Sequence, residues 1–182
     1  MGWSLRARLF HWVTVIAITV QWIIGLSLLG GMAMAGNVWL TAHLSLGLVL
    51  LALTLLRLGS RIFDHAPRRA RSPLAAVVAT LGHAGLYALL LLVPLTGWLG
   101  YRPAPFMPPP LAFGLLPMPV LAGVEGVSSR TILGLHALLT WVLVALVALH
   151  GLAALFHAVV LRDGVLGGML RGRGHESGDR QP

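Results

Sequence analysis

The stretch LHALLTWVLVALVALHGLAALFH, Leu135 to His157, is an apolar run without a charged residue, yet it contains three histidines. His136, His150 and His157 are separated by 14 and then by 7 residues. In an α-helix, 14 residues return to within about 40° of the starting direction and rise about 21 Å. The spacing predicts that His136 and His150 share a helix face, near opposite sides of a membrane, and that His157 lies about 10 Å further along.

Composition points to the same environment. The chain has 182 residues, of which 57% are hydrophobic and only 10% are charged, whereas about a quarter of the residues in soluble domains are charged. It contains no cysteine, which excludes disulfides, iron–sulfur clusters, thiolate metal sites and covalent haem attachment through a CxxCH motif. These values indicate an integral membrane protein.

Four apolar blocks are long enough to cross a bilayer, which takes about 20 helical residues. Short loops and the absence of strand-like alternation favour an all-α four-helix bundle. We assign this bundle to residues 1–170 and a flexible cytoplasmic tail to residues 171–182. The predicted spans are Leu9–Leu29, Leu40–Leu58, Ala76–Tyr101 and Thr131–Leu161.

The arginines predict the orientation. All 13 basic residues are arginine, and the net charge is +8. Eleven fall on one side of the predicted bundle, against Arg102 and Arg130 on the other, so the positive-inside rule places both termini in the cytoplasm. Contact with lipid headgroups explains these charges better than nucleic acid does. The eleven are Arg6, Arg8, Arg57, Arg61, Arg68, Arg69, Arg71, Arg162, Arg171, Arg173 and Arg180.

The predicted outer loop, residues 102–130, is rich in proline and apolar side chains. A solvated linker would be hydrophilic. We therefore expect this loop to fold back over the bundle or to lie in the membrane interface, either as a cap over a cofactor or as a packed structural loop.

Histidines in the other three spans fall at matching depths. His43 lies near the outer end of the second span and joins His136 in an outer layer. The inner layer contains residues from three spans, with His157 at or beyond the cytoplasmic boundary. Its members are His11, His83 and His150.

Ionisable groups inside a membrane are costly and by default suggest function. Zinc needs three or four converging ligands, usually with carboxylates or thiolates, and no carboxylate lies within the four spans. Haem needs only one or two axial histidines for each iron. Two layers of histidines therefore favour two bis-histidine b haems, with hydrogen-bonded packing as the alternative for any single histidine.

Glycines give modest further support, because small residues leave room beside a flat cofactor. Gly25 and Gly97 follow His11 and His83 by 14 residues and are expected to face the outer layer. The other two glycines near histidines are Gly47, one turn from His43, and Gly151, next to His150.

One arginine shares this pattern. Arg57 follows His43 by 14 residues, so it lies on the same face at the cytoplasmic end. It is a candidate partner for a haem propionate, and a topological anchor is an equally good explanation. His65 and His175 are interpreted as solvated surface residues.

An ordered set of segments resembles the prokaryotic cytochrome b561 family from Arg8 to Leu170. The set comprises RARLFHW, HLSLGLVLLALTLLRL, HAGLYALLLLVPLTGW, LAFGLLPMP and LHALLTWVLVALVALHGLAALFHAVVLRDGVLGGML. The resemblance implies a cytochrome of the bacterial inner membrane with two b haems. The inner haem would take His11 and His150, and the outer haem would take His43 and His136.

The resemblance also implies electron transfer between ubiquinone or another quinone and a donor or acceptor at the outer face. Some members are linked to superoxide oxidation, which would make this chain a superoxide:quinone oxidoreductase, with Arg102 and Arg130 steering the anion. His83 and His157 are expected to contact a quinone, move protons or stabilise a propionate, with packing as the alternative.

Two other functions stay open at this point. Related cytochromes anchor hydrogenases and formate dehydrogenases, so the chain could be an electron-relay subunit with a dehydrogenase partner. A haem-free proton or metal transporter lined with histidines is the third hypothesis, and the lack of buried carboxylates counts against it. A homodimer is neither predicted nor excluded by the sequence.

Overall fold

The structure is a computed structural model that describes residues 3–29, 37–63, 72–103, 111–121 and 123–170. Each of its four long helices is long and apolar enough to cross a membrane, which confirms the four predicted spans. Each helix begins two to four residues before the predicted start. The helices are α1 (Leu5–Leu29), α2 (Asn37–Phe63), α3 (Pro73–Gly100) and α4 (Ser129–Phe156).

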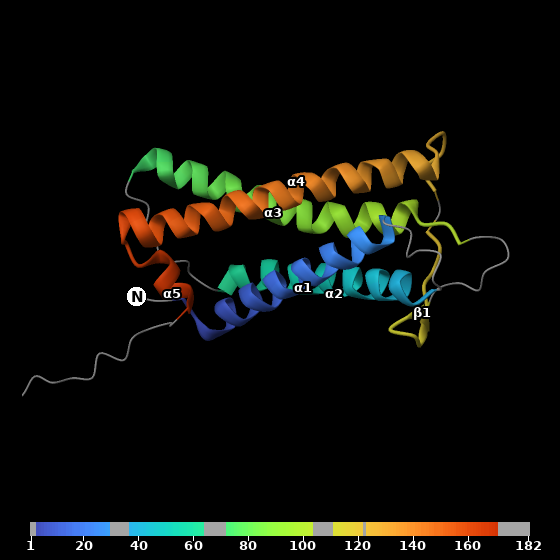
Figure 1. Cartoon of the computed structure of the whole chain (residues 1–182), viewed down its shortest axis with the longest axis horizontal. Helices are drawn as coiled ribbons and strands as arrows, with labels where there is room; N and C mark the ends of the chain where they lie inside the picture. Colours follow the sequence, from blue (N-terminus) through green and yellow to red (C-terminus); the bar gives the residue numbers. More distant parts are fainter. Residues whose placement is uncertain (1–2, 30–36, 64–71, 104–110, 122, 171–182) are drawn as a thin grey trace, which may run out of the picture.

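The helices form two layers, with α1 beside α2 and α3 beside α4 (Figure 1). A small core of Leu89, Leu90 and Leu143 joins α3 to α4. Contacts between α2 and α3 connect the layers, whereas α1 and α2 make no comparably close backbone contact with α4 among the described residues. The space between α4 and the α1–α2 layer is therefore left to side chains.

The outward faces of the helices are apolar. Ile16, Leu138 and Leu152 are each at least 60% exposed, which would be unfavourable in water for so many large side chains. In a bilayer the same side chains contact lipid tails. The chain is therefore a multi-pass membrane protein.

Polar groups at helix starts and in the bundle are satisfied locally. The Ser72 hydroxyl accepts a hydrogen bond from the backbone N–H of Ala75, and Pro73 occupies the first turn of α3, a favourable start for a helix. Three buried hydroxyls each donate to the carbonyl four residues earlier in the same helix, so none is left unpaired in an apolar environment. They are Thr14, Ser45 and Thr54.

A two-stranded hairpin corrects the purely helical prediction. Strand β1 (Leu111–Ala112) pairs antiparallel with β2 (Leu116–Pro117), and Phe113 and Gly114 adopt positive φ values of 55° and 70° in the turn. Strands of two residues are too short to produce the alternation that predicts a strand. The loop does fold back on the bundle, because β1 packs on α2. Residues 104–110 of the loop lie outside the described residues.

The chain after α4 continues through a π-helical turn, His157–Leu161, before a short helix α5 (Val165–Leu170). Arg162 has a φ of 48° at the bend. α5 then lies beside the start of α1, where Arg8 Nη2 donates to the Leu170 carbonyl at 3.0 Å. The predicted tail, residues 171–182, lies outside the described residues.

Candidate functional site

The first histidine pair joins α2 to α4. The ring centroids of His43 and His136 are 6.2 Å apart, with an angle of 83° between the ring planes. A metal–imidazole bond is about 2.0–2.1 Å and the ring centre lies about 1 Å behind the bonding nitrogen, so two imidazoles on opposite sides of one metal have centroids about 6 Å apart. The ring planes are free to differ, since each imidazole can rotate about its bond. We call these two residues the His43–His136 pair.

A hydrogen bond orients one member of this pair. Nδ1 of His136 lies 2.8 Å from the carbonyl oxygen of Val93. A carbonyl can only accept, so Nδ1 carries the proton and Nε2 keeps its lone pair. Metal-binding histidines are commonly fixed in this way. The arrangement prepares Nε2 of His136 to bind a metal.

Two glycines make room for the pair. A Cβ atom at Gly97 would lie 2.9 Å from Cε1 of His136, and one at Gly25 would lie 3.4 Å from Cε1 of His43. Both glycines therefore face the pair, as their 14-residue spacing from His11 and His83 predicts. The other two glycines differ from this pattern: Gly47 faces Gln21, and Gly151 has no neighbour within 4 Å among the described residues.

The second site contains three histidines. The ring centroids of His11 and His150 are 6.3 Å apart, a spacing close to that of the first pair. The ring of His83 lies 5.3 Å from that of His150, so His150 stands between two neighbours. We call these three residues the His150 cluster.

Arg57 adds a positive charge to the His150 cluster. Its Nη2 donates to Nδ1 of His11 at 3.3 Å, and its guanidinium carbon lies 5.7 Å from the centre of the Tyr87 ring. The predicted position of Arg57, at the far end of the α2 face that carries His43, is therefore observed. His83, from α3, has its Nδ1 only 2.6 Å from the Ala79 carbonyl, which leaves the lone pair on Nε2.

His157 stands apart from the cluster. Its Nδ1 lies 2.6 Å from Oδ2 of Asp163, and their side chains are 39% and 13% exposed. Oδ1 of Asp163 accepts a hydrogen bond from the backbone N–H of Val165 at the start of α5. No ring contact joins His157 to the other histidines in the part of the chain that the structure describes.

Sequence reasoning missed two residues beside these sites. Asp163 has a visible signal, since it is an acidic residue in an arginine-rich segment shortly after His157. Gln21 is a lone amide in the first apolar run, and its Nε2 donates to the His43 carbonyl at 2.9 Å. Its Oε1 is buried and has no protein partner among the described residues.

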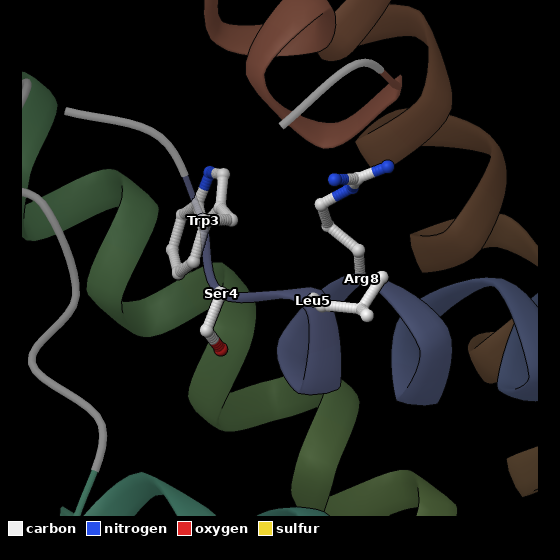
Figure 2. Close-up of a pocket in the computed structure, with 4 residues that line it drawn as sticks. All are labelled: Trp3, Ser4, Leu5 and Arg8. Atoms are coloured by element: carbon white, nitrogen blue, oxygen red, sulfur yellow. The ribbon is translucent and has the colours of Figure 1, made fainter. Parts of the chain in front are cut away.

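A pocket of about 330 Å³ at the start of α1 is a different feature. Trp3, Ser4, Leu5 and Arg8 line it, and Figure 2 shows these four side chains around the first turn of α1. None of the histidines lines this pocket, so it is not part of either site.

The donor sets can be tested against the metals that they would hold. Among the described residues, no group of three or more histidine, cysteine or acidic side chains could hold a bare metal ion. Haem iron brings four nitrogen ligands of its own and needs only two opposed imidazoles. Both histidine pairs have the spacing for that role, and the loose contact of α1 and α2 with α4 is compatible with a broad cofactor. The residues present therefore fit haem.

Comparison with known proteins identifies the family. The family model described as prokaryotic cytochrome b561 matches residues 2–172. The chain is 28% identical to cytochrome b561 homolog 2 of Escherichia coli K12 over 168 residues, which cover 88% of this chain and 87% of that protein. It is 30% identical to cytochrome b562 of Cereibacter sphaeroides over 131 residues, which cover 72% and 67% of the two chains.

A third relative has a more specific name. It is a Yersinia pestis protein named "Probable superoxide oxidase CybB", 28% identical over 161 residues that cover 86% of this chain and 88% of the relative. Since the family model matches nearly the whole chain, the chain belongs to the prokaryotic cytochrome b561 family of membrane electron-transfer proteins, whose name implies b-type haem.

Proposed function

We propose that this chain binds two b haems and carries electrons across the membrane between a quinone at one face and a donor or acceptor at the other. One observation carries the proposal: two pairs of histidines from different helices lie at two depths, with centroid spacings of 6.2 and 6.3 Å. His43 and His136 would hold one haem, and His11 and His150 the other.

A b haem supplies one-electron Fe(III)/Fe(II) chemistry, and the chain supplies position and surroundings. α4 contributes one ligand to each haem, and its 14-residue spacing separates the two ligands by about 21 Å along the helix. With histidines on both axial positions, neither iron keeps an open site for oxygen. This arrangement suits electron transfer and does not suit an oxidase.

Arg57 would serve the haem at the His150 cluster. An imidazole that binds iron through Nε2 carries its proton on Nδ1, so the guanidinium at 3.3 Å from Nδ1 of His11 would then face a donor. A haem propionate is a better partner for a guanidinium, since it can accept two parallel hydrogen bonds. We therefore assign Arg57 to a propionate.

The remaining histidines would serve the quinone. Oxidation of a quinol releases two electrons and two protons, so the protein must accept protons near the haem that takes the electrons. His83 lies beside His150 with its Nε2 unprotonated, which suits contact with a quinone hydroxyl. His157 with Asp163 offers a second proton acceptor at the same end of α4.

The orientation follows from the arginines. The start of α1 and the end of α5 lie at the same end of the molecule, since Arg8 bonds to Leu170. The predicted arginine distribution places this end in the cytoplasm. The quinone site would then be near the cytoplasmic face of the inner membrane, and the His43–His136 pair near the outer face.

Superoxide is the proposed donor at the outer face, because a relative bears that activity in its name. Two superoxide anions would each lose one electron to give two molecules of oxygen, and the electrons with two protons would reduce one quinone to quinol. Arg102 and Arg130, at the loop ends of α3 and α4, would attract the anion. A variant that lacks both charges should react more slowly with superoxide, and added salt should narrow the difference.

The first experiment is to measure haem content per chain on the purified protein, with a reduced-minus-oxidised spectrum. Two low-spin b haems per chain would support the proposal. One haem would mean that one histidine group is structural. A colourless protein would end the electron-transfer proposal for this chain.

A further inference from the structure

We infer that the hairpin β1–β2 is a lipid-facing finger, which inserts its apolar turn into the membrane leaflet at the His43 end of the bundle. The finger is residues 111–117. This inference concerns the membrane and does not depend on haem, quinone or the direction of electron flow.

The depth of the finger follows from one hydrogen bond. The backbone N–H of Phe113 donates to the Ser45 hydroxyl at 2.8 Å. Ser45 lies seven residues beyond Val38, the first residue of the apolar span Val38–Ser60, which is about 10 Å of helix. A loop that lay on the membrane surface would not reach this serine.

Tryptophans mark the level from which the finger descends. Trp indoles concentrate at the boundary between lipid tails and headgroups. Trp39 lies six residues before Ser45 in α2, and Trp98 near the end of α3 donates to the Pro119 carbonyl at 2.9 Å. The chain therefore leaves the finger at the level of Trp98 and reaches further in at Ser45.

The composition of the finger suits lipid tails. Its seven residues include no charge and no polar side chain. Leu115 is 80% exposed and Leu116 is 62% exposed, while Ala112 is 2% exposed against the bundle. The finger thus has one face on the protein and one open apolar face, which is continuous with the apolar outer surface of the span beside it.

The backbone of the finger is also prepared for an apolar environment, in which an unpaired N–H is costly. The N–H of Gly114 bonds to the Leu111 carbonyl and the N–H of Leu115 to the Ala112 carbonyl, both at 3.1 Å. The Phe113 N–H is paired with Ser45. The three turn residues therefore have their donors satisfied without water.

Single-cysteine spin labels can test this inference, because the chain has no native cysteine. We would label Leu115→Cys and, as a second probe, Leu116→Cys, and reconstitute the full chain in phosphatidylcholine–phosphatidylglycerol vesicles. Collision rates with oxygen, which concentrates in lipid, and with a water-soluble nickel chelate would then be compared. Leu138→Cys on the open face of α4 is the lipid reference, and Val124→Cys on the loop outside the finger is the water reference.

The expected result is that the label at 115 or at 116 behaves like the label at 138, with more collisions with oxygen than with the nickel chelate. A label that matches Val124→Cys would show that the finger projects into water, and the inference would be overturned. Labels shielded from both reagents would also overturn it, because a second copy or another protein would then cover the finger.

Discussion

The His43–His136 pair and the His150 cluster share helix α4 but differ in their surroundings. The pair is enclosed by glycines and oriented by a backbone carbonyl. The cluster has a third histidine and an arginine within reach. A closed pair suits a site that only exchanges electrons. A site with extra titratable and charged groups can also exchange protons and hold an anionic propionate. The predictions below test this division, from the largest expected effect to the smallest.

The largest effect is expected from removing one ligand of each site. His136→Ala should reduce the haem content from two per chain to one, because a bis-histidine iron with one ligand missing is held weakly. His150→Ala should do the same for the other haem. Haem extraction and quantification on the purified variants measure both effects, and the two spectra should differ because different haems remain.

The same assay can determine which histidine pairs with His150. His11→Ala should lose one haem, whereas His83→Ala should retain two. The opposite result would assign the ligand role to His83, whose ring is the nearer neighbour of His150, and would make His11 a partner of Arg57 alone.

The next effect tests the close packing of the pair. Gly97→Ala adds a Cβ at 2.9 Å from Cε1 of His136, and His136 has little freedom to move while it bonds to Val93. Such overpacking typically costs about 1–3 kcal/mol. We expect a lower thermal midpoint and partial loss of the haem held by the pair.

Gly82→Ala is the matched control for Gly97, because it lies on the same helix with no neighbour within 4 Å among the described residues. There, replacing glycine should stabilise the helix by about 0.5–1 kcal/mol. Equal effects of the two substitutions would show that the contact of Gly97 with His136 is unimportant for haem binding.

A smaller effect is expected when the third histidine of the cluster is removed. His83→Ala should keep both haems but slow their reduction by quinol about tenfold, which is the value of one hydrogen bond of about 1.4 kcal/mol. Stopped-flow reduction by a short-chain quinol measures this rate. Reduction by dithionite, which needs no quinone site, should be unchanged. A normal quinol rate would remove His83 from the proposed quinone site.

The sequence predicts the helices and the two depths of histidines because both depend on regular geometry. A 14-residue spacing is a property of the helix itself, so His136 and His150 could be placed on one face without a structure, and Gly97 could be directed at the same layer. The ligand roles remain predictions, since geometry alone does not bind iron.

Features that depend on irregular backbone could not be predicted in the same way. The contact between Phe113 and Ser45 joins residues 68 positions apart, through a turn with positive φ values that no periodic pattern reveals. The contact between His157 and Asp163 depends on the π-helical turn and on the left-handed conformation of Arg162. A continued α-helix would have carried Asp163 to a different face.

The smallest expected effect concerns this last contact, which joins the end of α4 to the start of α5. Asp163→Asn keeps an oxygen for the Val165 N–H but removes the charge beside His157. Because His157 is 39% exposed, the loss should be only about 0.2–1 kcal/mol. Asp163→Ala also removes the bond to Val165, which should add about 0.5–2 kcal/mol. Thermal unfolding of the two variants in one detergent compares them directly. If Asn is as harmful as Ala, then the charge on Asp163 matters more than its bond to the backbone, and the proposed proton acceptor at His157 gains support from a measurement that does not involve quinone.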